Sequence, residues 1–195
     1  MATRRFEIHL TLSSELHVEA LLEQAQAFSL TPTFVRLASG ESARQPMLTA
    51  RLEGDFVEAR AHACVLARKL EAHGIAVTRT KIEVERAGLP LMACGYIEHH
   101  VKVDVAEGQL DALRALCLRE HAHLSTNALA ALQEGRLLVF CTQRILDPQN
   151  TAHADSALAS LLHGLGELAG CVVRDIENEH VLEDSNQALD AGWMT

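Results

Sequence analysis

Apolar and polar residues alternate along "RFEIHLTL" at residues 5–12, a pattern that predicts a strand with one buried face. The stretch "YIEHHVKV" at residues 96–103 repeats the alternation and again carries a histidine on its polar side. The polar sides of the two stretches hold Glu7, His9 and Thr11, and Glu98, His100 and Lys102. The recurrence of such a strand in one chain suggests that the sequence contains an internal repeat.

The segments between and after these strands follow the same order in both halves of the chain. A helix is expected after the first strand, because Val18, Leu21 and Ala25 recur at intervals of three and four and form an apolar face. Ser13 or Ser14 is its expected cap. Asp55 and Glu58 form a capping pattern for a second helix. The corresponding helices of the second half lie within 108–122 and, starting at Asp147-Pro148, within 147–169. Further strands are expected at 31–38, 46–53, 75–85, 124–132, 136–146 and 171–181, although the alanine content of 124–132 is also compatible with a helix.

This order, strand–helix–strand–strand–helix–strand, is the ferredoxin-like unit, and it occurs twice. The sequence therefore predicts an α+β fold of two tandem ferredoxin-like repeats with antiparallel sheets, at residues 1–86 and 95–183. Residues 184–195 lose the pattern and are expected to form a frayed C-terminal tail. In each repeat both helices should cover one face of the sheet, which leaves the other face open.

Composition narrows the classes of partner. The net charge of −9 and an aromatic content of 4% argue against nucleic acid, which favours basic surfaces and stacking side chains. No apolar segment is long enough to cross a membrane, and no secretory leader pattern is present at the start of the sequence. Five widely spaced cysteines without a CxxC pair fit a reduced, cytoplasmic protein. The chain also offers no sequence motif for a cofactor.

The polar residues of the first and fourth strands of each repeat should share the open face. The fourth strands add Arg79, Lys81 and Glu83 in the first repeat, and Arg174, Glu177 and Glu179 in the second. One interpretation is a solvated sheet face without a role, because antiparallel sheets commonly carry such alternation. Another is an interaction surface for a homodimer, as an exposed sheet or strand edge often associates.

A third interpretation is a binding site for a small anionic ligand between the repeats. If the two sheets face each other, His9 and His100 would share one cleft, with Thr11 and Lys102 beside them. Two imidazoles in different environments can serve as acid and base, and cationic side chains can hold an anion. The predicted binding residues are Glu7, Thr11, Arg79, Lys81, Glu98 and Lys102.

The motif "HLTL", with His9 and Thr11, resembles one His-x-Thr/Ser motif of the two-lobed 2H phosphoesterases. The resemblance implies that His9 and His100 are catalytic, as general base and acid on a cyclic phosphodiester, and that a hydroxyl binds the phosphate. The second stretch departs from the motif, since Lys102 replaces the hydroxyl residue and "HLST" at 123–126 is out of register. No HExxH motif or cysteine cluster predicts a metal site, and the two imidazoles with Glu7 or Glu98 could bind a divalent ion only if the halves face each other. His99 and His100, being neighbours on a strand, point to opposite faces.

Overall fold

The computed structural model describes residues 4–38, 42–86, 94–129 and 135–191, and contains the two predicted ferredoxin-like repeats. The first repeat consists of β1 (Arg4–Leu12), α1 (Val18–Phe28), β2 (Thr31–Leu37), β3 (Arg44–Gly54), α2 (Phe56–Ala72) and β4 (Val77–Glu85). The second consists of β5 (Tyr96–Ala106), α3 (Leu110–Arg119), β6 (Ala122–Asn127), β7 (Arg136–Ile145), α4 (Thr151–Glu167) and β8 (Cys171–Asp184). Short 3-10 turns, η1 (Glu107–Gln109) and η2 (Gln187–Asp190), precede α3 and follow β8.

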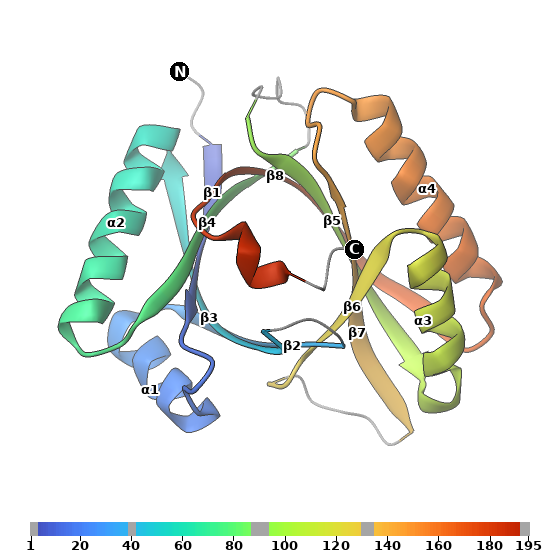
Figure 1. The fold of residues 1–195 in the computed structure, drawn as a ribbon, viewed down its shortest axis with the longest axis horizontal. Helices are drawn as coiled ribbons and strands as arrows, with labels where there is room; N and C mark the ends of the chain where they lie inside the picture. The colour runs from blue at the N-terminus through green and yellow to red at the C-terminus, as the bar shows by residue number, and fades with distance from the viewer. Residues whose placement is uncertain (1–3, 39–41, 87–93, 130–134, 192–195) are drawn as a thin grey trace.

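The sequence had suggested that each sheet leaves one face open, but the two sheets do not keep separate open faces. They join edge to edge into one closed barrel with the strand order β1-β3-β2-β6-β7-β5-β8-β4 (Figure 1). One seam pairs β2 with β6 over Val35–Leu37 and Ser125–Asn127. The other pairs β4 with β8, from Lys81 opposite Asp184 to Glu85 opposite Glu179. Closure pairs the edge strands of both repeats, so neither repeat leaves these edges to solvent.

Strand alternation divides the side chains between the outside and the inside of the barrel. The four helices lie on the outside, α1 and α2 against the first repeat and α3 and α4 against the second (Figure 1). Phe6, Ile8 and Leu10 of β1 are buried beneath α1 and α2. Val101, Val103 and Val105 of β5 occupy the corresponding core. The polar residues between them therefore point into the barrel.

Helix termini match the sequence signals only in part. Asp55 and Glu58 form the predicted capping box of α2, and Gly74 has φ +78° just after that helix. By contrast, α1 begins at Val18 rather than after Ser13 or Ser14, because Ser13 closes a turn with Leu16 instead. In α4, Asn150 accepts a hydrogen bond from the His153 amide, so the helix starts after the predicted Asp147-Pro148.

The chain after β8 is not a frayed tail as far as the structure describes it. Ser185 and Asn186 are hydrogen-bonded to β4, and η2 then lies within the ring of strands in the view of Figure 1. The Asp190 side chain is buried. Residues 192–195 of the predicted tail lie outside the described residues. In the described part of the chain, no helix has the length and apolarity that a membrane crossing needs.

Candidate functional site

The barrel encloses a cavity of about 280 Å³ between the two repeats, lined by side chains from all eight strands. It brings together all eight residues that the sequence had suggested as catalytic or ligand-binding. These residues are Glu7, His9, Thr11, Arg79, Lys81, Glu98, His100 and Lys102. The expectation that both histidines face one cleft is therefore met, although the cleft is a barrel interior rather than a gap between two sheets.

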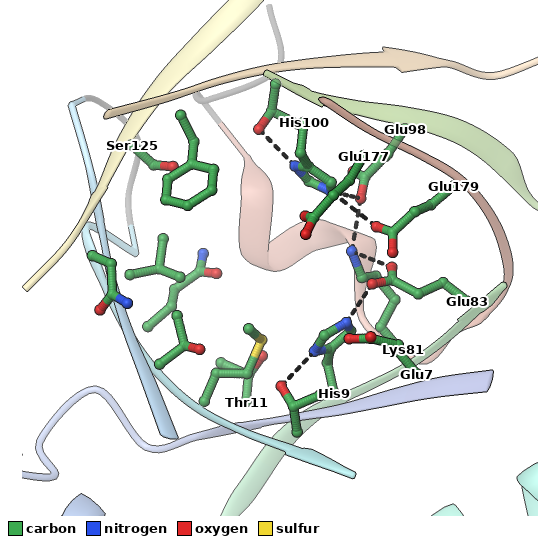
Figure 2. A pocket seen from close by; sticks show the side chains of 18 of the residues that line it. Glu7, His9, Thr11, Lys81, Glu83, Glu98, His100, Ser125, Glu177 and Glu179 are labelled. Atoms are coloured by element: carbon green, nitrogen blue, oxygen red, sulfur yellow. Dashed lines mark hydrogen bonds and ion pairs between the residues drawn. The ribbon is translucent and has the colours of Figure 1, made fainter. Parts of the chain in front are cut away.

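His9 is held at both ring nitrogens (Figure 2). Its Nδ1 lies 2.8 Å from the Thr49 hydroxyl on β3, and its Nε2 contacts the Glu83 carboxylate on β4. If Nε2–H donates to Glu83, Nδ1 accepts from the hydroxyl, so one tautomer satisfies both contacts. His9 is 8% exposed, and both its neighbours are buried.

His100 repeats the first of these contacts but not the second. Its Nδ1 lies 2.9 Å from the Thr142 hydroxyl on β7, the strand equivalent to β3. Its Nε2 has no close carboxylate like that of His9, lying 3.4 Å from Glu98 and 3.5 Å from Glu179. The His100 side chain is 20% exposed, against 10% for His9. The second imidazole is thus the one that remains accessible from the cavity.

Lys81 connects the two repeats on the side of the cavity that carries the histidines and the glutamates, called here the polar wall. Its Nζ lies 2.7 Å from Glu83 of its own strand and 2.7 Å from Glu98 of β5 (Figure 2). Burial alone would lower the pKa of Lys81, but these two carboxylates raise it well above its usual value. For Glu98, burial is likewise outweighed by Lys81, His100 and Arg144, which hold its pKa well below the ordinary range. This centre is therefore an ionised network.

Two arginines, one from each repeat, lie near one end of the polar wall. Arg79 donates to Asp184 over 2.8 and 2.6 Å, and Arg144 donates to Glu98 over 2.9 and 2.6 Å. Both arginines also contact Asp190. Arg79, which the sequence suggested as a ligand for an anion, is thus already paired with carboxylates of the chain itself.

The acids of β8 have a different environment. Glu177 and Glu179 project toward the cavity beside His100 (Figure 2). Burial, together with the nearby charge of Glu83, raises the pKa of Glu179 to about 10. This shift favours the protonated, neutral form of Glu179 at pH 7. Within the described residues, no lysine or arginine lies within ion-pair distance of either Glu177 or Glu179.

The opposite wall of the cavity is less polar. It contains the side chains Thr31, Thr33, Val35, Leu37, Met47, Ser125, Thr126, Asn127 and Phe140. Lys102 lies on this side, with its ammonium group 5.9 Å from the centre of the Phe140 ring. Figure 2 shows Ser125 across the cavity from Lys81 and the glutamates. The cavity is consequently two-sided: one side carries the glutamates, the histidines and Lys81, and the other carries hydroxyl, amide and apolar groups with Lys102.

Arg174 does not join the site, contrary to the expectation for the fourth strand of the second repeat. The β5–β8 register shifts at Lys102 and Val103, and this bulge displaces Arg174 from the alternation. Arg174 instead donates to Asp104, which also binds Arg136. His99 points away from the cavity as predicted and contacts Gln143.

Sequence reasoning missed four residues that shape the site, namely Thr49, Thr142, Arg144 and Asp190. The first three follow the same alternation on β3 and β7 as the histidines do on β1 and β5. Thr49 and Thr142 stand opposite His9 and His100, so the repeat itself contained the signal. Asp190 has no equivalent in the repeat and lies outside any strand. Among the described residues, no cluster of histidine, cysteine and acidic side chains could hold a metal ion.

No known family model matches the chain, and no curated protein matches it. Several solved structures are similar over most of their length. An anthrone oxidase-like protein shares 12% identity over 93% of this chain and 92% of its own, with a TM-score of 0.32. A protein of unknown function from Galdieria sulphuraria shares 18% identity over 93% and 100%, with a TM-score of 0.31. A heme-binding protein from Thermus thermophilus shares 8% over 93% and 92%, with a TM-score of 0.32. Scores this low support no inference about activity.

Proposed function

We propose that this protein binds a small organic molecule inside its barrel. The observation that carries the proposal is the cavity of about 280 Å³, lined by a polar and a less polar wall. Eight-stranded barrels are either filled by their own side chains or hold one small ligand. The volume is close to the lower end of the range for small-molecule sites, about 300–1,000 Å³. A ligand of roughly ten non-hydrogen atoms is the size expected.

The charges favour a ligand that carries a protonated amine. Arg79, Lys81 and Arg144 already have carboxylate partners, so they offer little uncompensated positive charge. Lys102 lies on the opposite wall, over the Phe140 ring, and leaves the side that carries the glutamates acidic. Glu177 and Glu179 face the cavity without a lysine or arginine at ion-pair distance among the described residues. An ammonium group placed beside Glu179 would stabilise its carboxylate and replace the proton that it otherwise holds. The apolar part of the ligand would lie against Val35, Met47 and Phe140.

Three probes of matched size test this assignment: benzylamine, benzyl alcohol and benzoate. Benzylamine is expected to raise the melting temperature most, since stabilisation reaches about 2.7 kcal/mol at a hundredfold excess over the dissociation constant. Calorimetry in buffers of different ionisation enthalpy should show about one proton released on binding at pH 7. Release is expected because the protonated amine displaces the Glu179 proton.

Two tryptophan substitutions on β2 locate the binding. Val35→Trp projects into the cavity and is expected to abolish the benzylamine shift, whereas Arg36→Trp, on the exposed outer face, is expected to preserve it. Equal shifts in both variants would place binding outside the barrel and contradict the proposal. A larger effect of benzoate than of benzylamine would reverse the charge assignment and return support to an anionic ligand.

The phosphoesterase hypothesis stays a second candidate. It is favoured by the presence of His9 and His100 in one cavity with Thr11. The two ring nitrogens of His9 are engaged by Thr49 and Glu83, which leaves His100 as the more accessible acid or base. Hydrolysis of 2′,3′-cyclic nucleotides by the wild type, lost in His9→Ala and in His100→Ala, would support this candidate. An interaction role stays a prediction that a mass measurement in solution tests.

A further inference from the structure

Asp190 lies at a junction between the two repeats. Its carboxylate accepts from Arg144 Nη2 at 2.7 Å and from Arg79 Nη1 at 3.2 Å to Oδ1 and 3.1 Å to Oδ2. Gln45 Nε2 donates to the same carboxylate at 3.4 Å. Arg79 and Gln45 belong to the first repeat and Arg144 to the second. Asp190 is 2% exposed, so these charge-assisted contacts are formed away from bulk water.

The two arginines are fixed by other groups as well. Arg79 is held by Asp184, and its Nη2 lies 3.3 Å from the Tyr96 hydroxyl. The Arg144 guanidinium carbon lies 4.3 Å from the centre of the Tyr96 ring. Arg144 is also held by Glu98. Their remaining N–H groups thus converge on one point without requiring Asp190 to position them, which is the geometry of a preorganised oxyanion site.

Asp190 reaches this point on a short segment that follows β8. The Ser185 amide donates to the Thr80 carbonyl at 3.0 Å, and the Thr80 amide donates to the Ser185 hydroxyl at 2.8 Å. Asn186 Nδ2 donates to the Thr78 carbonyl at 3.1 Å. These bonds secure the start of the segment to β4. Four residues further along, η2 contacts the barrel through the Asp190 carboxylate.

We propose that Arg79, Arg144 and Gln45 form a binding site for a small carboxylate, which Asp190 of the same chain fills. A free carboxylate of similar shape competes with Asp190 for these donors. The site is distinct from the amine position beside Glu179 and does not depend on it. A ligand that carried both groups would span from Glu179 to the arginines.

Chemical rescue of Asp190→Ala tests the site directly. The variant lacks the carboxylate but keeps the arginines, so sodium acetate at millimolar concentration is expected to raise its melting temperature by several degrees. Acetamide, which has the same shape without the charge, and sodium chloride at equal ionic strength should not. In the wild type, the half-saturating acetate concentration should be at least tenfold higher, because the tethered Asp190 competes.

A double variant provides the matched control. In Asp190→Ala/Arg144→Gln the acetate effect should disappear, since one of the two guanidinium donors is gone. Should Asp190→Ala fail to fold, Asp190→Asn keeps the side-chain shape without the charge and permits the same titration. Equal acetate midpoints in wild type and variant, or a rescue that survives Arg144→Gln, would overturn the proposal. The outcome is independent of benzylamine binding, so failure of one proposal does not imply failure of the other.

Discussion

The fourth strands of the two repeats occupy equivalent places in the barrel but carry different charges. On β4, Arg79, Lys81 and Glu83 stand opposite Thr11, His9 and Glu7. On β8, the equivalent positions opposite Lys102, His100 and Glu98 are Asp175, Glu177 and Glu179. The first and third strands differ less between the repeats. In both repeats the first strand has a glutamate and a histidine, which pair with an arginine and a threonine of the third strand.

This difference makes the halves complementary rather than equivalent. Lys81 of β4 reaches across to Glu98 of the second repeat, while its counterpart Glu177 forms no such link in the part of the chain that the structure describes. Arg79 and Lys81 of β4 form ion pairs with carboxylates of the second repeat, whereas the acids of β8 face the cavity. Equivalent strands of the two repeats thus differ in their contacts: β4 links the repeats, and β8 presents acids to the cavity.

The largest expected difference between β4 and β8 follows from removing Lys81, the cation that links the repeats. Lys81→Met leaves Glu83 and Glu98 without their shared partner, and loss of one member of a buried ion pair typically destabilises by about 3–5 kcal/mol. Glu177→Gln, at the equivalent place on β8, is expected to change stability by no more than about 0.5 kcal/mol. Urea unfolding at pH 7 measures both. Similar losses in the two variants would show that β8 also links the halves.

The pH dependence of stability should have opposite signs at Glu83 and Glu179. Burial alone would raise the pKa of Glu83, but His9 and Lys81 lower it. The stabilising effect of Glu83 is therefore present above about pH 4.3, the pKa in the unfolded chain, and is lost on acidification. Glu179, with a pKa raised to about 10, stays protonated while the unfolded chain ionises from about pH 4.3. It therefore lowers stability progressively as the pH rises toward 10, by at most about 1.4 kcal/mol per unit.

Variants at these two positions sharpen the contrast. The stability of Glu179→Gln relative to wild type should increase by about 1–3 kcal/mol from pH 6 to pH 8.5, because the substitution removes that dependence. Glu83→Gln should instead lose stability, with the loss diminishing below pH 4.3. Guanidinium unfolding at several pH values measures both. A constant difference between Glu179→Gln and wild type across this range would show that Glu179 is ionised in the folded protein.

The smallest expected difference concerns the two histidines. His9→Asn breaks contacts with Thr49 and Glu83 in a buried place and should destabilise by about 1–3 kcal/mol. His100→Asn loses the Thr142 contact at a more accessible place, and about 1 kcal/mol is expected. Thermal unfolding of both variants at pH 7 compares them. A larger loss for His100→Asn would mean that its longer contacts with Glu98 and Glu179 dominate.

The order of elements and the inward direction of the site residues could be predicted from the sequence, because both depend on local periodicity. Alternation alone places His9 and Glu7 on the polar side of β1, whatever the partner strands are. The duplication likewise follows from the recurrence of "RFEIHLTL" as "YIEHHVKV". These features require no knowledge of how the repeats are oriented.

Closure of the barrel could not be predicted in this way. It depends on pairing between β2 and β6 and between β4 and β8, and no local pattern specifies which edges meet. Asp184 and Glu98, which pair with Arg79 and Lys81, come from the other repeat, so only closure brings these carboxylates to the two cations. Asp190 was missed for a related reason, as a lone acid outside any strand gives no periodic signal. The prediction of an anionic ligand treated Arg79 and Lys81 as unpaired cations, because their partners Asp184 and Glu98 were not known.

The β4–β8 seam also has a consequence for how quickly the chain reaches its native state. Arg79 and Asp184, which meet beside this seam, are 105 positions apart in the chain. Contacts of such high sequence separation form slowly, since the entropy of closing a long loop opposes them until the sheet is complete. Each ferredoxin-like sheet can form from nearer segments. Joining the two sheets is therefore expected to be the slow step of folding.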